Sequence, residues 1–212
     1  MYKEEAIELF TEYLDDFNVR YRWISTSEDE DCSELFFVTD GMSNSPGEFV
    51  ETTIDFCDSC ISARAYYNVM GQKLVAENLE RFPALFRLLN FINEKKNHIS
   101  INRQSRFDGD EEKSAIFTPQ LRMTEDLKHD IKYTLVVDYQ YLELFPNQTV
   151  QMLVVFLQLY LNSFAPSVFG VLTGKMNLKE AKENIVSITY NKMSPLDYGL
   201  PTNKENDEED DE

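Results

Sequence analysis

Glycine and histidine are both scarce in this chain, which has seven glycines and two histidines among its 212 residues. The patterns that hold phosphates or present a catalytic serine, such as the P-loop, Gly-x-Gly-x-x-Gly and Gly-x-Ser-x-Gly, are absent, as is the zinc motif His-Glu-x-x-His. The two histidines, His98 and His129, stand apart in segments that we expect to lie at the surface. The sequence therefore predicts a protein that is not an enzyme, with no catalytic residue, no metal site and no cofactor.

Positive charge is in short supply as well. The chain has 20 lysine and arginine residues against 38 aspartate and glutamate residues, which gives a formal net charge of -18. Because such a surface repels phosphate groups, we expect neither nucleic acid nor an anionic membrane as a partner. A basic protein partner fits this charge, and so does a simple role of the acids in solubility.

A long apolar run is also missing. The longest apolar segment, Met152 to Leu161, is too short to cross a bilayer and contains Gln158. The first residues, MYKEEAIELF, carry carboxylates where a signal peptide has basic and then apolar residues. We therefore expect a cytoplasmic protein.

Three cysteines are an odd number, and in a cytoplasmic chain they do not suggest a disulfide framework. Cys57 and Cys60 form a Cys-x-x-Cys motif. A redox pair of the thioredoxin type needs a helix N-terminus, whereas residues typical of strands flank this motif. A zinc site needs about four ligands, and beyond Cys32 and the two histidines the chain offers no second paired motif. We favour a tight turn flanked by two thiols, and a partial metal site or a redox-sensitive pair are the alternatives.

The apolar residues around this motif predict its local structure. They occupy even positions up to Phe56 and odd positions from Ile61 onward. A two-residue turn at Asp58-Ser59 brings both sets to one face, with Phe56 opposite Ile61 and Val50 opposite Tyr67. The same register places the two cysteines opposite each other on the polar face of a hairpin.

Hydrophobic periodicity along the rest of the chain predicts an α+β domain. The expected helices cover residues 4–17, 76–96, 150–163, 167–174 and 177–185, and the expected strands cover 19–25, 33–40, 50–56, 61–69, 98–107, 114–123 and 132–145. Short turns between consecutive strands favour an antiparallel sheet flanked by helices, in the order helix, strands, helix, strands, helices. We expect a single domain over residues 1–202 and a disordered acidic tail over residues 203–212.

Polar residues and prolines predict where several helices begin and end. Asn147 or Thr149 is suited to cap the helix 150–163, and Pro166 is expected to end it. Asn177 with Glu180 three residues later forms a capping-box pattern that begins the last helix. In the middle helix the expected buried side consists of Phe82, Leu85, Phe86, Leu89 and Ile92.

Aromatic residues are abundant, with eleven tyrosines and fifteen phenylalanines. Segment 132–145 carries aromatic residues at odd positions and Val136 on its other face, so helices cover both faces or one face exposes apolar surface to a partner. Helix 150–163 is apolar nearly all round and needs cover on more than one side, from segment 167–186, from a second subunit of a homodimer or from a partner helix. The candidate partner-binding residues in this region are Tyr139, Tyr141, Phe156, Tyr160 and Phe164.

Two short motifs indicate a family. The middle helix ends with Leu88, Leu89, Asn90, Ile92 and Asn93, and in the closing segment Pro166, Val168, Val171 and Gly174 precede a helix that contains Ala181. Over roughly residues 4–187, this order of elements and motifs resembles the YbjN-type family, which is related in fold to the type III secretion chaperones. The resemblance implies an α+β domain of the secretion chaperone type that binds proteins or peptides and has no established catalytic residues. The chain departs from the family in having four strands, not three, before the middle helix and in its acidic tail.

Two functions fit these observations. The first is a non-catalytic, cytoplasmic protein-binding or chaperone-like module that holds a protein or peptide segment. The alternative is an acidic protein of the immunity type that neutralises a basic partner. The position of the acidic residues distinguishes the two, because a folded acidic face favours the neutralising protein, whereas acids confined to loops and tail favour the chaperone-like module.

Overall fold

A computed structural model describes residues 1–24, 32–96, 98–102, 114–126 and 128–188 of the chain. It is an α+β fold, as the sequence predicts. Six strands form one antiparallel sheet in the order β1-β2-β3-β4-β8-β7, and β5 pairs with β6 in a separate ribbon. The strands are β1 (Tyr21–Ile24), β2 (Ser33–Asp40), β3 (Phe49–Phe56), β4 (Cys60–Tyr67), β5 (Ile99–Asn102), β6 (Ser114–Phe117), β7 (Gln120–Met123) and β8 (Ile131–Asp138).

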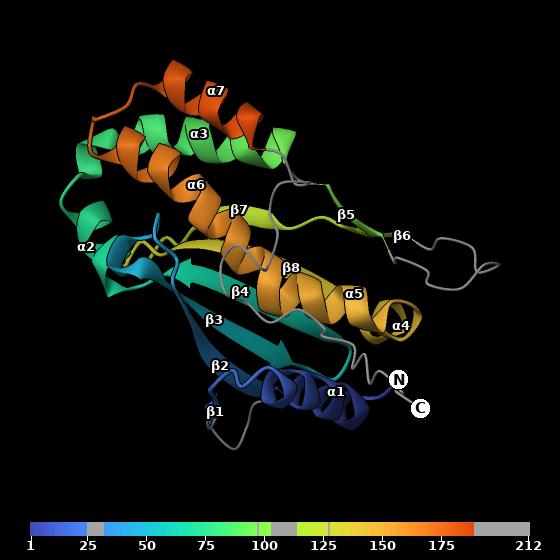
Figure 1. The fold of residues 1–212 in the computed structure, drawn as a ribbon. Helices are drawn as coiled ribbons and strands as arrows, with labels where there is room; N and C mark the ends of the chain where they lie inside the picture. Colours follow the sequence, from blue (N-terminus) through green and yellow to red (C-terminus); the bar gives the residue numbers. More distant parts are fainter. Residues whose placement is uncertain (25–31, 97, 103–113, 127, 189–212) are drawn as a thin grey trace, which may run out of the picture.

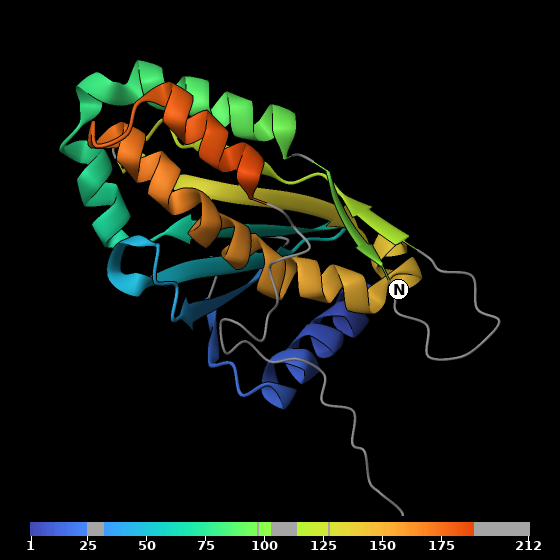
Figure 2. The same cartoon turned by 45° about the horizontal axis from the view of Figure 1, so that its top comes forward.

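The long helices gather on one face of the six-stranded sheet, which we call the inner face (Figure 1). Helix α6 crosses this face diagonally, and α3 and α7 lie side by side beyond it (Figures 1 and 2). Helices α1 and α4 contact each other near one end of the sheet. The helices are α1 (Lys3–Asp16), α2 (Val69–Ala76), α3 (Phe82–Lys95), α4 (Tyr139–Leu144), α5 (Pro146–Gln151), α6 (Leu157–Leu172) and α7 (Leu178–Ser187).

The hairpin of β3 and β4 has the predicted register. Phe56 lies opposite Ile61 and Val50 lies opposite Tyr67, and the pairs between them follow the same register. All four side chains are buried on the inner face. The hydrophobic phase change across the turn is sufficient to fix this pairing, because a shift by one residue would turn the whole apolar set of one strand to the outer face.

One helix start agrees with the sequence, and another lies later than predicted. The side chain of Asn177 accepts hydrogen bonds from the backbone N–H groups of Lys179 and Glu180, and the Glu180 carboxylate accepts one from the Asn177 N–H, all at 3.0 Å. This capping box begins α7 as predicted. Helix α3 begins at Phe82, later than the start of the helix expected over residues 76–96, and Pro83 lies in its first turn, where its missing N–H costs no helical hydrogen bond.

The prediction for the apolar helix was wrong at both ends. Helical structure begins at Pro146 and continues to Leu172 through α5, a π-helical turn (Met152–Phe156) and α6. Neither Asn147 nor Thr149 caps it, and Pro166 lies inside α6. Burial explains the persistence of the helix, because the flanking residues Ala165 and Val168 are completely buried. The packing of this side therefore outweighs the local cost of a proline.

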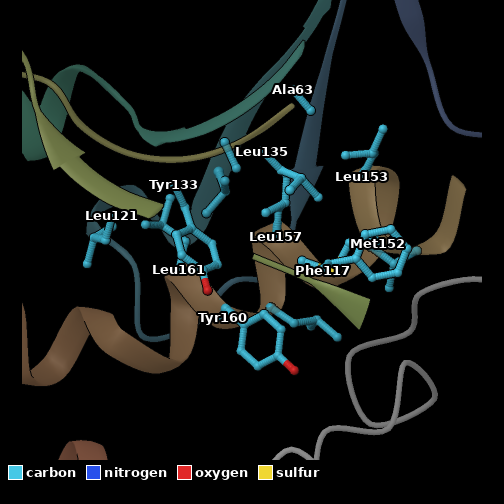
Figure 3. Close-up of a cluster of buried hydrophobic side chains, with 14 of the residues drawn as sticks. Ala63, Phe117, Leu121, Tyr133, Leu135, Met152, Leu153, Leu157, Tyr160 and Leu161 are labelled. Carbon is cyan, nitrogen blue, oxygen red and sulfur yellow. The ribbon is translucent and has the colours of Figure 1, made fainter. Parts of the chain in front are cut away.

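Cover for this apolar helix comes from the chain itself. Inner-face residues of β8 point at α6, with Tyr133 and Leu135 facing Leu157 and Leu161 (Figure 3). On its other side α6 contacts α3 and α7. The helical stretch Pro146–Leu172 is long and apolar enough to cross a membrane, but 78% of its most apolar window is buried inside the molecule. Such burial is typical of a core helix.

The expected strand over residues 132–145 was wrong in its second half. Strand β8 ends at Asp138, whose carboxylate accepts a 2.6 Å hydrogen bond from the Tyr141 N–H and caps α4. The strand expected over 114–123 divides at Pro119 into β6 and β7, which belong to different sheets. A proline cannot donate to a strand ladder, which explains the division.

Two further details depart from the predictions. The strand expected to continue to residue 69 ends at Tyr67, and the Asn68 side chain caps the unpredicted helix α2 by accepting a bond from the Met70 N–H at 2.8 Å. In α3, Phe86 is 45% exposed and does not join the buried side. The domain boundary at residue 202 and the tail 203–212 lie outside the described residues.

Candidate functional site on the outer face of the sheet

The outer face of the sheet is the side opposite α6. Its side chains alternate with the buried inner-face set, so neighbouring strands present Glu34, Glu51, Arg64 and Lys132. Among the described residues no helix crosses this face (Figures 1 and 2). Val136 of β8, which belongs to the same face, is 61% exposed. The outer face is therefore a surface of the sheet that a partner can approach.

A network of charges crosses three strands of this face. The guanidinium of Arg64 on β4 lies 2.8 Å from the Asp55 carboxylate on β3 and 3.4 Å from the Glu34 carboxylate on β2. Beside it, the Arg64 Nε and the Thr53 Oγ1 are buried and have no hydrogen-bond partner within the described part of the chain. The network fastens three strands together and leaves polar atoms beneath it unsatisfied.

A polar hollow of about 350 Å³ lies next to this network. Glu51 and Tyr66 line it from the sheet, and Gln72 donates a 2.6 Å hydrogen bond to the Asp130 carboxylate at its rim. Burial, followed by repulsion from Asp130, raises the pKa of the Glu51 carboxyl. Burial, followed by the charge of Glu51, raises the pKa of Tyr66 to about 12. The hollow is therefore a partly buried site lined by side chains of both charges.

Metal binding is not supported in the part of the chain that the structure describes. In that part no group of three or more His, Cys, Asp or Glu side chains is arranged to hold a metal ion. The partial zinc site considered as an alternative for Cys57 and Cys60 therefore has no further ligands among these residues.

A second and larger hollow, the edge groove, lies where the first two strands meet. Its volume is about 860 Å³, and Phe17, Val38, Val154 and Val155 form its apolar walls. Strand β1 pairs only with Glu34 to Phe37 of β2. The second half of β2 has no strand partner on this side within the described ranges. The edge groove therefore follows an open stretch of sheet edge.

The rim of the edge groove carries both signs of charge. Arg20, Arg22, Asp40 and Glu51 line it. The guanidinium of Arg22 lies 4.7 Å from the centre of the Phe36 ring, in a cation–π arrangement. Arg22 therefore covers apolar surface, while Asp40 is exposed.

Helix α1 presents a folded acidic face beside this groove. Its buried side is formed by Ala6, Phe10 and Leu14. Its exposed carboxylates are those of Glu4, Glu5, Glu8, Glu12, Asp15 and Asp16. The next residue along the chain, Phe17, lines the edge groove. A partner in the groove therefore lies close to the C-terminal end of an acidic surface.

The cysteines occupy one end of the outer face. Cys57 and Cys60 flank the Asp58-Ser59 turn as predicted, and the Cys57 N–H donates a 3.0 Å hydrogen bond to the Cys60 carbonyl. The expectation of no disulfide was wrong, because Cys57 is bonded to Cys32 and only Cys60 keeps a free thiol. The pairing of Ser33 with Phe56 places Cys32 beside Cys57. That pairing of β2 with β3 was the missing information, since spacing along the chain does not reveal it.

The aromatic residues proposed as a partner site contribute to the core. Tyr139, Tyr160 and Phe164 are 8%, 1% and 0% exposed. Tyr141 is half-buried, and its hydroxyl donates a bond of 2.8 Å to the Ile116 carbonyl and accepts one of 2.7 Å from the Ile116 N–H. Phe156 is half-buried beside Tyr160. In this arrangement, the first three side chains are out of reach of a partner, and Tyr141 fastens the β5–β6 ribbon to α4.

Comparison with known proteins adds no identification: no family model, no curated protein and no solved structure matches this chain. The resemblance to the YbjN-type family therefore stays a prediction from the sequence motifs.

Proposed function

We propose that this protein is a non-catalytic binding module that holds an extended segment of another protein in the edge groove. The observation that carries this proposal is the open edge of β2 within a groove of about 860 Å³. An exposed strand edge offers backbone N–H and C=O groups that an extended chain can pair with. The groove continues onto both faces of the sheet, since Phe37 belongs to the inner face and Val38 to the outer face.

Recognition in this mode divides between the backbone and the side chains. Backbone pairing along β2 supplies affinity, and alternate side chains of the bound segment enter opposite faces. One set meets the apolar wall formed by Val154 and Val155 of the π-helical turn. The other set meets Val38 and the carboxylate of Glu51. The preferred segment is therefore extended and apolar at the alternate positions that face Val154 and Val155.

The motif resemblance supports the same class of function. A YbjN-type domain related to the type III secretion chaperones binds proteins or peptides and needs no catalytic residues. We include in this proposal a fold of the secretion chaperone type and a cytoplasmic location.

A second candidate, neutralisation of a basic partner protein, is favoured by one observation. Six of the 38 acidic residues lie exposed on α1, so the acids are not confined to loops and tail. In this case the acidic helix face, rather than the groove, makes the main contact. Binding by α1 would fall steeply with ionic strength, because exposed charge pairs are screened.

Site-specific photo-crosslinking tests the proposal. A photoreactive residue replaces Val38 in the groove or, as a matched control, the exposed Val136 of β8 on the same face. We expect crosslinks to a single protein segment from position 38 and none from position 136. That segment, made as a peptide, should bind the purified protein and lose affinity in Val38→Lys but not in Val136→Lys. Equal crosslinking at both positions would contradict the proposal, and loss of binding in Glu8→Gln/Glu12→Gln alone would favour the neutralising protein.

A further inference from the structure

The three cysteines lie in one row across the outer face of the sheet. Continuing the pairing of Ser33 with Phe56 by one residue places Cys32 opposite Cys57. The turn places Cys57 opposite Cys60. The row therefore runs from β2 through β3 to β4, with Cys57 in the middle. All three side chains point to the outer face, because Leu35, Phe56 and Ile61, each an odd number of positions from its cysteine, point inward.

Cys57 is within bonding reach of both neighbours. Its Cα lies 4.2 Å from that of Cys32, to which it is bonded. On its other side, the Cys57 N–H donates to the Cys60 carbonyl across the two-residue turn, and residues opposite each other in an antiparallel pair have Cα atoms about 4.5 to 5.5 Å apart. Disulfides usually form at Cα separations of about 4.4 to 6.8 Å, and cross-strand neighbours at this spacing meet that requirement. The structure thus holds a free thiol directly beside a disulfide.

We propose that this row is a thiol–disulfide exchange site in which Cys57 changes its partner between Cys32 and Cys60. The Cys60 thiolate attacks the Cys57 sulfur, a Cys57–Cys60 disulfide forms, and the Cys32–Cys57 bond breaks. Cys32 leaves as a thiolate and takes up the proton that Cys60 gave up. One disulfide and one thiol are present before and after the step, so no external oxidant or reductant is needed.

The order of the strands favours this attack. Exchange proceeds when the attacking, central and leaving sulfurs lie near one line, and β4, β3 and β2 present them in that order. The backbone of the central cysteine is held in place, because the Tyr139 hydroxyl donates a 2.6 Å hydrogen bond to the Cys57 carbonyl. All three cysteines are partly exposed, so the leaving thiolate reaches solvent.

Exchange moves a covalent tie from one pair of strands to another. The Cys32–Cys57 bond joins residues 25 positions apart and ties the start of β2 to the end of β3. The Cys57–Cys60 bond joins the two sides of one tight turn. After exchange, the start of β2 is no longer tied covalently to β3. The four-residue strand β1, which borders the edge groove, then keeps its pairing with β2 and the contact of Trp23 with Phe56, without a nearby covalent tie. This inference does not rest on the proposed function.

Alkylation mapping of the purified full chain tests the exchange. The oxidised protein is incubated at mildly alkaline pH without added thiol, quenched with acid, and alkylated, and its peptides are mapped by mass spectrometry without reduction. We expect label first on Cys60 and then on a growing share of Cys32, with none on Cys57. Label confined to Cys60 at all times would overturn the proposal, as would label on Cys57.

Two single variants give an independent answer. Cys32→Ser should still form a disulfide, between Cys57 and Cys60, after mild oxidation. Cys60→Ser should contain only the Cys32–Cys57 bond and take up no label. Circular dichroism shows that each variant is folded, and the wild-type mapping decides the matter if one is not. A folded Cys32→Ser protein in which Cys57 and Cys60 both stay alkylatable after oxidation would also overturn the proposal.

Discussion

Replacement of Cys57 by serine removes the disulfide and tests how much it contributes to stability. The bond joins residues 25 positions apart, so it closes a loop of that length in the unfolded chain. The chain-entropy relation for such a loop gives a stabilisation of about 3.5 kcal/mol at 25 °C. We expect the free energy of unfolding of Cys57→Ser to be lower than that of the wild type by about this amount.

Urea unfolding followed by tryptophan fluorescence measures this loss. Trp23 is the only tryptophan, and its ring lies 6.2 Å from that of Phe56, the residue before Cys57. With a denaturant slope of about 2 kcal/mol/M, the midpoint should fall by roughly 1.5 to 2 M. Reductant should lower the wild-type midpoint to the same value and leave Cys57→Ser unchanged.

Cys60→Ser is the matched control, because it makes the same chemical change on the neighbouring strand without breaking the bond. Its stability should stay within about 1 kcal/mol of the wild type. Equal midpoints for wild type and Cys57→Ser under oxidising conditions would refute the reasoning. The Cys-x-x-Cys motif would then be a simple turn whose thiols add no stability. An equal loss in both variants would show that the serine, and not the broken bond, is responsible.

Two further predictions concern the sheet. Burial raises the pKa of the Glu51 carboxyl above its ordinary value of 4.5, so the folded state holds that proton more tightly than the unfolded state, and the free energy of unfolding should fall as the pH rises from the ordinary pKa through the raised one. Glu51→Gln should lack this fall. Parallel plots of stability against pH for the two proteins, measured by urea unfolding from about pH 4 to 7, would contradict the prediction. The buried Tyr67 hydroxyl donates a 2.6 Å hydrogen bond to the Leu161 carbonyl, so Tyr67→Phe should lose about 1 kcal/mol in urea unfolding, and an unchanged midpoint would contradict this.

The sequence predicted those elements whose structure is decided by nearby residues. The β3–β4 hairpin follows from one change of hydrophobic phase across two residues, and the register agrees throughout. The start of α7 follows from Asn177 and Glu180, which satisfy each other's backbone N–H groups. In both cases the groups that determine the structure lie within a few residues of each other.

Predictions failed where distant residues decide. The Cys32–Cys57 bond depends on the pairing of β2 with β3, whose register no local pattern reveals. Helix α4, which contains Tyr139 and Tyr141, is an exception, because the Asp138 carboxylate that caps it is a local signal that the strand alternation of the segment obscured. Pro166 failed as a helix end because α6 is buried on the sides around it. Local propensity is a weak prior wherever tertiary packing opposes it.

The cover of the apolar helix also determines where a partner can bind. A helix that is apolar all round needs cover on several sides, and a second subunit is one way to provide it. The inner face of the sheet, α3 and α7 supply that cover within one chain, and the side chains of Tyr160 and Phe164 are buried in this packing. The polar atoms left without a partner among the described residues of the sheet, Thr53 Oγ1 and Arg64 Nε, belong to the outer face. The open strand edge of β2 borders that same face. Binding through the aromatic residues of the helix would require the core to open, whereas binding at the outer face and its edge requires no such change.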